Sequence, residues 1–347
     1  MEPFVASTLS VPHVSGRSPV RSLTGVQVLA TGSYVPEQVV TNDQLRLSFG
    51  IDPEWIVQRT GILERRHAAP EMATSDLAVA AGRRCIENAG VRPDEIDLLL
   101  VGTFTPDMPL PSTACLVQDR LGIRAPAMDV QAACAGFIYA LVTGMQFVAT
   151  GCSRLALVIG ADCNSRIINP HDRRTFPLFG DGAGAVLLGS GNREQGLLAY
   201  TLGSDGSGAD LLSRPMGGSR APLSCSAIEQ NLQYIRMDGR AVFKWAVRVL
   251  TDTIRDVLSA AGMGVEDIDL LALHQANIRI IDSAVADLGI DPRKVFINLQ
   301  RYGNTSAGSI PLVLDEAAAA GRIERGSKVM ISGFGAGLAW GTALLRW

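Results

Sequence analysis

Cys134 is the residue of this chain whose type and position best fit covalent catalysis. It stands between Asp129-Val130, where a strand is expected to end, and Ala135-Gly136-Phe137, where a helix is expected to begin. Unpaired backbone N–H groups at a helix start favour the thiolate, which is the nucleophilic form of cysteine. The alternative is an inert apolar side chain, which is how most free cysteines behave. The other five cysteines have no neighbour that would activate them.

His274 and Asn304 are the side chains best placed to assist such a nucleophile. His274 directly follows the apolar run Asp269–Leu273, and active sites of α/β proteins form at strand ends. Asn304 lies in the turn-like segment Tyr302–Ser309. A core histidine bonded to backbone and an ordinary turn asparagine remain the alternatives for these two residues.

An internal repeat predicts how these residues come together. An offset of 172 residues relates Ala89-Gly90 to Ala261-Gly262, and it also relates the segment 133–136 to 305–308 and 157–159 to 329–331. Three matches in one order indicate a duplicated unit, with halves at 27–194 and 195–347 after an extension over 1–26. Asn304 lies two residues before Ser306, the expected counterpart of Cys134. The two symmetry-related loops are therefore expected to meet.

Hydrophobic patterning predicts an α/β fold in each half. Apolar runs of strand length alternate with segments of helical spacing, as in layered proteins whose helices cover sheet faces. Helices are expected over 75–89 and 243–261, and strands over 97–103, 154–160, 182–189, 269–274 and 339–347.

Composition excludes several classes of protein. The chain has 347 residues, 47% of them hydrophobic and 19% charged, which fits a globular core and does not fit disorder. A net charge of −3 argues against nucleic acid as the main partner. Six cysteines without a CxxC pair and only four histidines argue against a zinc cage or a disulfide scaffold, and they fit reduced thiols in a cytoplasmic enzyme.

Two segments raise the question of location. Residues 130–153 carry no charge, but glutamines and glycines interrupt the stretch, so a helix buried in the core is expected in place of a membrane span. Residues 1–26 hold five serines, three prolines and one acid, Glu2. A flexible extension or an organelle transit peptide, such as one for plastids, fits this composition.

Several motifs together resemble β-ketoacyl-[acyl-carrier-protein] synthase III, over the chain from about Gly25 to Trp347. The resemblance implies the thiolase fold, in which two pseudo-symmetric α/β halves form five αβαβα layers, and it implies a homodimer. The motifs are EWIVQRTG at 54–61, DVQAACAGFIY at 129–139, FGDGAGA at 179–185, HQANIRI at 274–280, GNTSAGSIP at 303–311 and FGAGLAWG at 334–341.

Related enzymes of this fold differ in their catalytic residues. Thiolases use a second cysteine near the C-terminus, and no cysteine follows Cys225 in this chain. Elongating synthases use two histidines, whereas His274 is the only one in the second half. The glutamate of hydroxymethylglutaryl-CoA synthases has no evident counterpart, and chalcone-type synthases are longer and lack these HQAN and GNTSAG motifs. A starter enzyme or acyltransferase of a specialised pathway, and a non-catalytic scaffold for acyl carrier protein (ACP), remain alternatives.

The resemblance implies a decarboxylative Claisen condensation that begins fatty acid synthesis. Cys134 would take the acyl group of an acyl-CoA starter, expected to be acetyl-CoA, with the backbone N–H groups of Cys134, Gly335 and Ala336 as the oxyanion hole. His274 and Asn304 would donate hydrogen bonds to the enolate that malonyl-ACP forms on losing CO₂. The product is 3-oxoacyl-ACP, and no metal, flavin or nicotinamide is required.

The resemblance also implies where the substrates bind. It assigns Trp55, Arg59, Arg166 and Asn277 to CoA, and Leu110 and Phe334 to the acyl pocket, with Leu110 acting partly across the dimer. It assigns Arg279, Lys244 and Arg248, beside Arg240, to the docking of ACP. Ala286 and Asp287 stand where many members of the family carry two lysines, so the docking patch is expected to be weaker or shifted.

Overall fold

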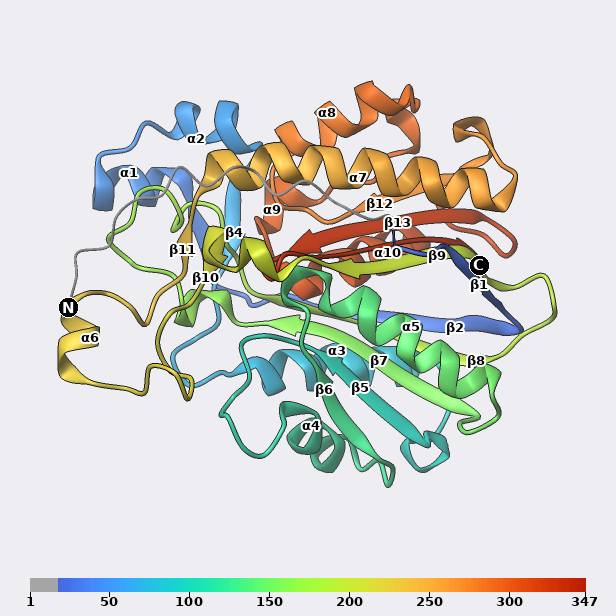
Figure 1. Cartoon of the computed structure of the whole chain (residues 1–347). Helices are drawn as coiled ribbons and strands as arrows, with labels where there is room; N and C mark the ends of the chain where they lie inside the picture. Colours follow the sequence, from blue (N-terminus) through green and yellow to red (C-terminus); the bar gives the residue numbers. More distant parts are fainter. Residues whose placement is uncertain (1–17) are drawn as a thin grey trace.

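Two five-stranded sheets organise the part of the chain that this computed structural model describes, residues 18–347 (Figure 1). In order across the sheet, the first consists of β1 (Arg21–Thr24), β9 (Gly196–Ser204), β14 (Ala339–Arg346), β13 (Lys328–Gly335) and β12 (Leu270–Leu273). The second consists of β2 (Val26–Tyr34), β8 (Gly182–Ser190), β7 (Leu155–Asp162), β5 (Leu98–Gly102) and β6 (Ala127–Val130).

Helices fill the three remaining layers. The helices α5 (Gly136–Ala149) and α10 (Ser309–Ala319) lie between the sheets, where they share one apolar core with strands of both. Two helices, α7 (Gly239–Ala261) and α8 (Ile278–Leu288), cover the outer face of the first sheet. Two others, α3 (Thr74–Ala89) and α4 (Thr113–Leu121), cover the outer face of the second. The five αβαβα layers are those of the expected thiolase fold.

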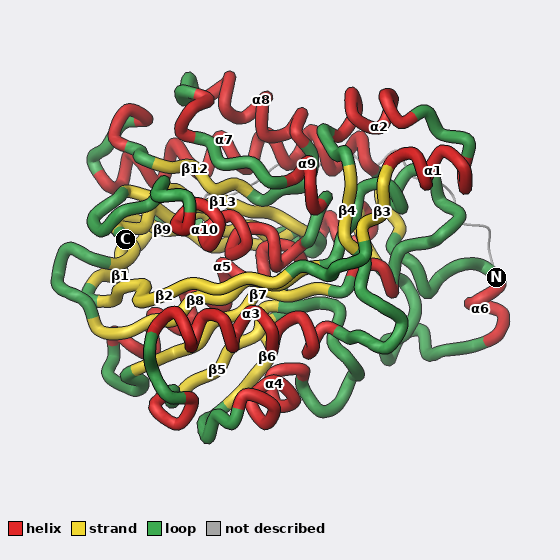
Figure 2. Tube along the Cα trace, turned by 180° about the vertical axis from the view of Figure 1, so that it is seen from behind, coloured by secondary structure: helices red, strands yellow, loops and turns green. Residues whose placement is uncertain are grey.

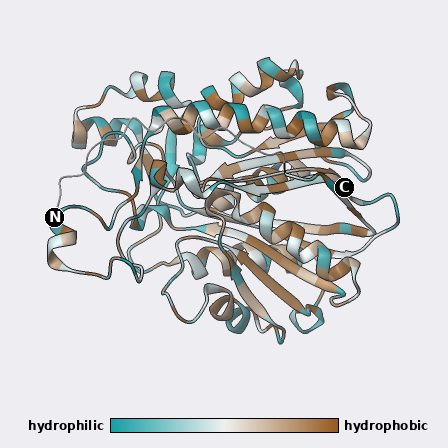
Figure 3. Ribbon diagram, in the orientation of Figure 1, coloured by the Kyte–Doolittle hydropathy of each residue, from teal (hydrophilic) through white to brown (hydrophobic). Residues whose placement is uncertain are grey.

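The central part of the uncharged segment at 130–153 forms α5, whose side chains pack against both sheets. Figure 3 shows hydrophobic residues along this helix and along the strands of the two sheets, with hydrophilic residues on the outer helices. Of the helices between residues 18 and 347, none combines the length and hydropathy that crossing a bilayer requires.

The repeat predicted from the sequence is present in the two sheets, with one shift in register. The order β2-β8-β7-β5 in one sheet matches β9-β14-β13-β12 in the other, and a single bridge at Val295 stands in the place of β6. The bounds of β7 and β13 differ by 173 residues, as do the starts of α5 and α10. Cys134 therefore corresponds to Ala307, and the expected match to Ser306 is wrong by one residue.

The backbone confirms this register. A short 3₁₀ turn precedes each central helix, at Ala133–Ala135 and at Ser306–Gly308. The first residue of each turn is in the left-handed region, with φ of 48° at Ala133 and 53° at Ser306. A non-glycine residue rarely adopts this conformation, so its occurrence at both places marks equivalent positions.

The predicted N-terminal extension is partly folded. Within 1–26, β1 pairs antiparallel with β9 at the edge of the first sheet, so the prediction of a flexible segment is wrong for residues 21–24. Residues 1–17, on which the transit-peptide hypothesis mainly rests, lie outside the described residues. The long helix α7 also begins earlier than predicted, because the Asp238 side chain accepts hydrogen bonds from the N–H groups of Arg240 and Ala241.

Smaller elements gather at one end of the layers, beyond the strand ends that carry the site (Figures 1 and 2). They are α1 (Asn42–Phe49), α2 (Pro53–Thr60), α6 (Cys225–Glu229), α9 (Leu299–Tyr302), β3 (Val39–Thr41), β4 (Glu64–Arg66), β10 (Leu212–Ser213) and β11 (Arg236–Met237).

Candidate active site

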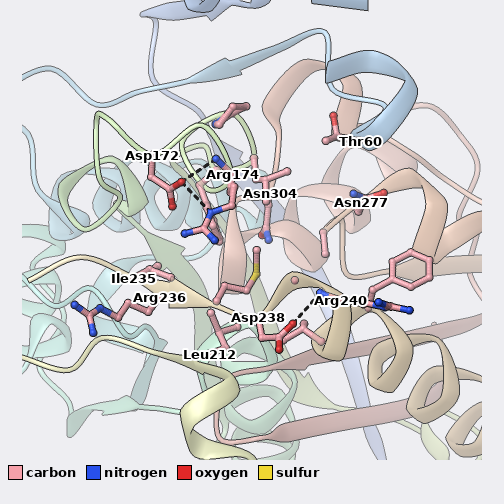
Figure 4. Close-up of a pocket in the computed structure, with 18 of the residues that line it drawn as sticks. Thr60, Asp172, Arg174, Leu212, Ile235, Arg236, Asp238, Arg240, Asn277 and Asn304 are labelled. Carbon is pink, nitrogen blue, oxygen red and sulfur yellow. Dashed lines mark hydrogen bonds and ion pairs between the residues drawn. The ribbon is translucent and has the colours of Figure 1, made fainter. Parts of the chain in front are cut away.

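A cavity of about 1120 Å³ opens at the end of the layers where these smaller elements lie. Cys134, His274 and Asn304 all line it, together with Phe334 and Gly335. Figure 4 shows Asn304 and Asn277 around this space, with Thr60 of α2 on one side and, on another, Arg240 of α7 and Asp238, the cap of that helix. The three residues predicted to act together therefore reach one space from three separate loops and from both halves of the chain.

Cys134 is 7% exposed and lies in the 3₁₀ turn that leads into α5. The pKa of its thiol is raised to about 12, chiefly by burial and in smaller part by the charge of Asp162, whereas the Ser306 hydroxyl acts in the opposite direction. The expectation of a resting thiolate is therefore wrong, because desolvation outweighs the helix start. Loss of the thiol proton must accompany attack on a substrate.

Gly335, at the end of β13, approaches the backbone of Cys134 closely. A Cβ atom at this glycine would lie 2.6 Å from the Cys134 nitrogen. Only glycine fits at position 335. Because it has no side chain, the space beside the Cys134 N–H group stays free. The arrangement suits an oxyanion hole made of Cys134 and Gly335 N–H groups. Ala336 is not among the residues that line the cavity.

His274 is buried directly after β12 and is held by a residue that sequence reasoning missed. Its Nδ1 lies 2.7 Å from Oγ of Ser309, and the same hydroxyl oxygen accepts a hydrogen bond from the N–H of Gln275. We infer that the Ser309 hydroxyl donates to Nδ1, which places the imidazole proton on Nε2. Burial lowers the pKa of His274 to about 3, so the ring is neutral and offers Nε2–H as a donor.

The Asn304 side chain is fixed with its amide nitrogen free to donate. Its Oδ1 accepts a hydrogen bond of 2.9 Å from the Ser306 N–H, which leaves the NH₂ group for the cavity. Its backbone is bonded in both directions, to Leu178 O and to Gly180 N. A carboxamide cannot take up a proton at this position, so Asn304 is a permanent hydrogen-bond donor.

Phe334 packs against the histidine at the inner end of the cavity. Its ring meets His274 edge to face at 5.4 Å between centroids, and it meets Trp245 at 5.9 Å. The Phe334 ring is part of the burial that lowers the pKa of His274.

Comparisons with known proteins agree with this geometry. Family models described as "3-Oxoacyl-[acyl-carrier-protein (ACP)] synthase III" and its "C terminal" part match residues 128–206 and 258–347. A relative from Rhodopirellula baltica named beta-ketoacyl-[acyl-carrier-protein] synthase III is 56% identical in an alignment 344 positions long, which covers 94% of this chain and 99% of the relative.

The chain belongs to the β-ketoacyl-[acyl-carrier-protein] synthase III family.

Solved structures support the same assignment. A β-ketoacyl-ACP synthase III from Thermus thermophilus is 42% identical, with a TM-score of 0.86 over 92% of this chain and 99% of its own. The priming β-ketosynthase of the R1128 polyketide pathway is 36% identical, with a TM-score of 0.86 over 96% and 98% of the two chains.

Three of the four residues assigned to CoA from the resemblance to β-ketoacyl-ACP synthase III line the cavity. Trp55 is 46% exposed, and the Arg59 guanidinium lies 5.7 Å from its ring centroid. Asn277 donates a hydrogen bond to the Arg59 carbonyl and, as the cap of α8, accepts one from the Arg279 N–H. Arg166 does not reach the cavity, because its guanidinium donates to backbone carbonyls of the 68–72 loop.

Leu110 also lies outside the cavity. It is 84% exposed in the loop before α4, so it does not line the cavity of its own chain, and its expected role at the acyl pocket across a dimer stays a prediction. The position would have to act on a second copy, as the resemblance to the synthase III family implies.

The basic residues assigned to ACP docking are not equivalent. Arg279 lines the cavity and lies 5.5 Å from the Phe243 ring, and Lys244 is exposed on α7. Arg248 is engaged with Asp252, at 3.6 Å, and faces a separate small hollow. Further arginines line the cavity that sequence analysis did not single out, namely Arg173, Arg174 and Arg236. Arg173 and Arg174 come from a loop and Arg236 from the two-residue strand β11, segments without a periodic pattern, so only their charge could have indicated them.

Proposed function

We propose that this β-ketoacyl-ACP synthase III joins an acyl-CoA starter, expected to be acetyl-CoA, to malonyl-ACP through an acyl-Cys134 intermediate. The observation that carries the proposal is the convergence of Cys134, His274 and Asn304 on one cavity. Sulfur is the nucleophile, and the other two side chains are neutral hydrogen-bond donors. That set serves a reaction in which negative charge develops on oxygen.

In the first half-reaction the Cys134 sulfur attacks the thioester carbonyl of acyl-CoA. A carbon–sulfur bond forms, the CoA thiolate leaves, and the cysteine proton is transferred to it. The N–H groups of Cys134 and Gly335 stabilise the oxyanion of the tetrahedral intermediate. His274 is not a strong proton acceptor, since burial lowers its pKa to about 3.

In the second half-reaction malonyl-ACP takes the place of CoA. The bond between the carboxylate and the central carbon breaks, CO₂ leaves, and the electron pair passes to the thioester oxygen. Nε2–H of His274 and the Asn304 amide donate hydrogen bonds to that enolate oxygen. The enolate carbon attacks the carbonyl of acyl-Cys134, the bond from that carbonyl to the Cys134 sulfur breaks, and 3-oxoacyl-ACP is released. The Cys134 thiolate then takes up a proton from solvent, which regenerates the thiol. We infer that no cofactor takes part, because these groups account for each charge.

The wider setting is part of the proposal. The apolar, exposed Leu110 supports a homodimer in which this residue meets the acyl pocket of the second copy. The six free thiols fit a cytoplasmic location. The likeness to a polyketide priming enzyme favours a second candidate, in which the same chemistry starts a specialised pathway with another acyl group.

Two measurements test the function. Intact-mass analysis after exposure to a series of acyl-CoAs would show which starter is loaded, with acetyl expected first. Preference for a long or branched starter would favour the specialised pathway. In Asn304→Ala, acylation should persist while condensation falls by about 10²-fold, the scale for loss of an oxyanion donor. Equal loss of both steps in a folded variant would contradict this division of roles between Cys134 and Asn304.

A further inference from the structure

The register between the two halves makes Asp162 in the first half the counterpart of Gly335 in the second. Both residues end the strand that lies beside the 3₁₀ turn of the other half, since β7 ends at Asp162 and β13 at Gly335. By the same register Cys134 corresponds to Ala307. The pairs Gly335 with Cys134 and Asp162 with Ala307 are therefore equivalent contacts in the two halves.

The two contacts differ in what faces the backbone N–H. On the catalytic side Gly335 has no side chain, and the Cys134 N–H is available to a substrate oxyanion. On the other side Oδ2 of Asp162 accepts a hydrogen bond of 3.0 Å from the Ala307 N–H. A carboxylate oxygen thus stands where, in the catalytic half, the negative oxygen of the reaction would form.

Asp162 is held rigidly enough to act as an anchor. Its Oδ1 accepts hydrogen bonds from the hydroxyls of Thr103 and Thr105, at 3.0 and 2.8 Å, and from the backbone N–H groups of Phe104 and Thr105. The residue has no exposed surface. A carboxylate is costly to bury, and burial raises the pKa of Asp162 to about 7 in spite of these donors.

The anchored loop is the one that carries Asn304. Ser306 adopts the strained left-handed conformation, and its N–H is the group that fixes Oδ1 of Asn304. Asp162 holds the next residue, Ala307, and Asn164 holds the Ser306 hydroxyl at 3.0 Å. Two side chains at the end of β7 therefore fix the turn that aims the Asn304 amide.

We infer that Asp162 is a positioning residue for condensation: its carboxylate fills, in the second half, the place that the oxyanion takes in the first, and it thereby fixes the Asn304 loop. This rests on the proposed function, because it assumes that Asn304 acts in condensation. Asp162 itself touches no substrate. Its effect on the reaction passes through Ala307, Ser306 and Asn304.

Asp162→Asn is the variant that tests this, because the side chain keeps its size. The new NH₂ group must face either the Ala307 N–H or the donors around Thr103 and Thr105, so at least one donor loses its acceptor. Condensation should fall by about tenfold or more, as expected for a misplaced hydrogen-bond donor. Acetylation of Cys134 from acetyl-CoA should stay within about twofold, because the Asp162 charge raises the thiol pKa and its loss does not hinder that step.

Asp97→Asn is the matched control. Asp97 also accepts several hydrogen bonds, from the Ser153 hydroxyl and the N–H groups of Arg154 and Leu155, but at the opposite end of β7. Asp97→Asn should lower the unfolding temperature, but it should not slow condensation more than it slows acetylation. Thr103→Val, which removes one donor to Asp162, should show the Asp162→Asn pattern more weakly, and it provides the test if Asp162→Asn does not fold.

The double variant Asp162→Asn/Asn304→Ala decides whether Asp162 acts through Asn304. Condensation in the double variant should match that of Asn304→Ala within about threefold, because residues that act as one unit are not additive. Losses that multiply, equal loss of both half-reactions, or behaviour like that of Asp97→Asn would overturn the inference. Normal condensation in Asn304→Ala alone would overturn the proposed function itself. If Asn304→Ala slows condensation and Asp162→Asn does not, only the positioning role of Asp162 is contradicted.

Discussion

The Ser309 hydroxyl lies 2.7 Å from Nδ1 of His274, where it can fix the tautomer of the imidazole. The same oxygen accepts the Gln275 N–H, and we infer that the serine proton is directed at Nδ1. The protonated nitrogen is then Nε2, as an enolate donor requires. A buried neutral histidine without such a partner would divide between two tautomers.

Ser309→Ala should therefore weaken condensation by about tenfold, the rate equivalent of roughly 1.4 kcal/mol for a lost hydrogen bond. Loading of Cys134 from acetyl-CoA should change little, since His274 is not needed as a base. Ser332→Ala is a suitable control, because Ser332 is also buried but bonds to Thr342. Single-turnover kinetics of both half-reactions would check this, and a normal condensation rate in Ser309→Ala would show that the serine does not set the tautomer.

Gly335→Ala should strongly slow the loading of Cys134. The added Cβ would lie 2.6 Å from the Cys134 nitrogen, a separation that forces the turn or the strand to move. We expect acylation to fall by about 10²-fold or more, because an oxyanion donor is displaced. Gly122→Ala provides a comparison, since it meets no atom within 4 Å although its φ of 72° adds strain. Equal acylation rates in the two variants would contradict the assignment of the oxyanion hole.

Arg279→Glu should raise the KM for malonyl-ACP and flatten its salt dependence. ACP is acidic, and charge at an interface acts mainly on encounter rate. Arg279 lines the cavity, whereas Arg248 is paired with Asp252 and faces elsewhere. Arg248→Glu should therefore have the smaller effect of the two. Steady-state kinetics at two ionic strengths would show it, and an unchanged KM in Arg279→Glu would exclude this residue from docking.

His274 should make the protein less stable in mild acid. Its folded-state pKa is about 3, below the unfolded value of about 6.5, so between these values the unfolded chain binds the extra proton. Stability consequently falls as pH drops through this window. Between pH 7 and pH 5 the titration of His274 lowers the free energy of unfolding by about 2 kcal/mol. Urea unfolding of the wild type and of His274→Asn would measure it, and parallel pH dependence in both proteins would show that burial does not lower this pKa.

The convergence of Cys134, His274 and Asn304 was predictable because each follows a strand or turn and because the chain repeats. The register was harder to predict. Ala135-Gly136 and Ala307-Gly308 match as letters at an offset of 172 residues, but the left-handed residues Ala133 and Ser306 show that 173 is correct. Backbone conformation decides such a shift, and sequence identity does not report it.

Other properties of the site depend on distant contacts. The raised pKa of Cys134 comes from burial by both halves, which local sequence around a helix start does not reveal. Arg166 stands in the expected motif, yet its guanidinium donates hydrogen bonds to backbone carbonyls of another loop. Ser309 and Asp162 act on groups 35 and 145 residues away, so their roles became visible only in the folded chain.

Acetylation of Cys134 is the most direct test of the central claim. The protein would be incubated with acetyl-CoA, digested and mapped by mass spectrometry, and then supplied with malonyl-ACP. We predict one acetyl group on the Cys134 peptide, absent in Cys134→Ala, which disappears as 3-oxobutanoyl-ACP forms. An acetyl group on Cys115 or Cys163, or labelling that persists in Cys134→Ala, would contradict the mechanism.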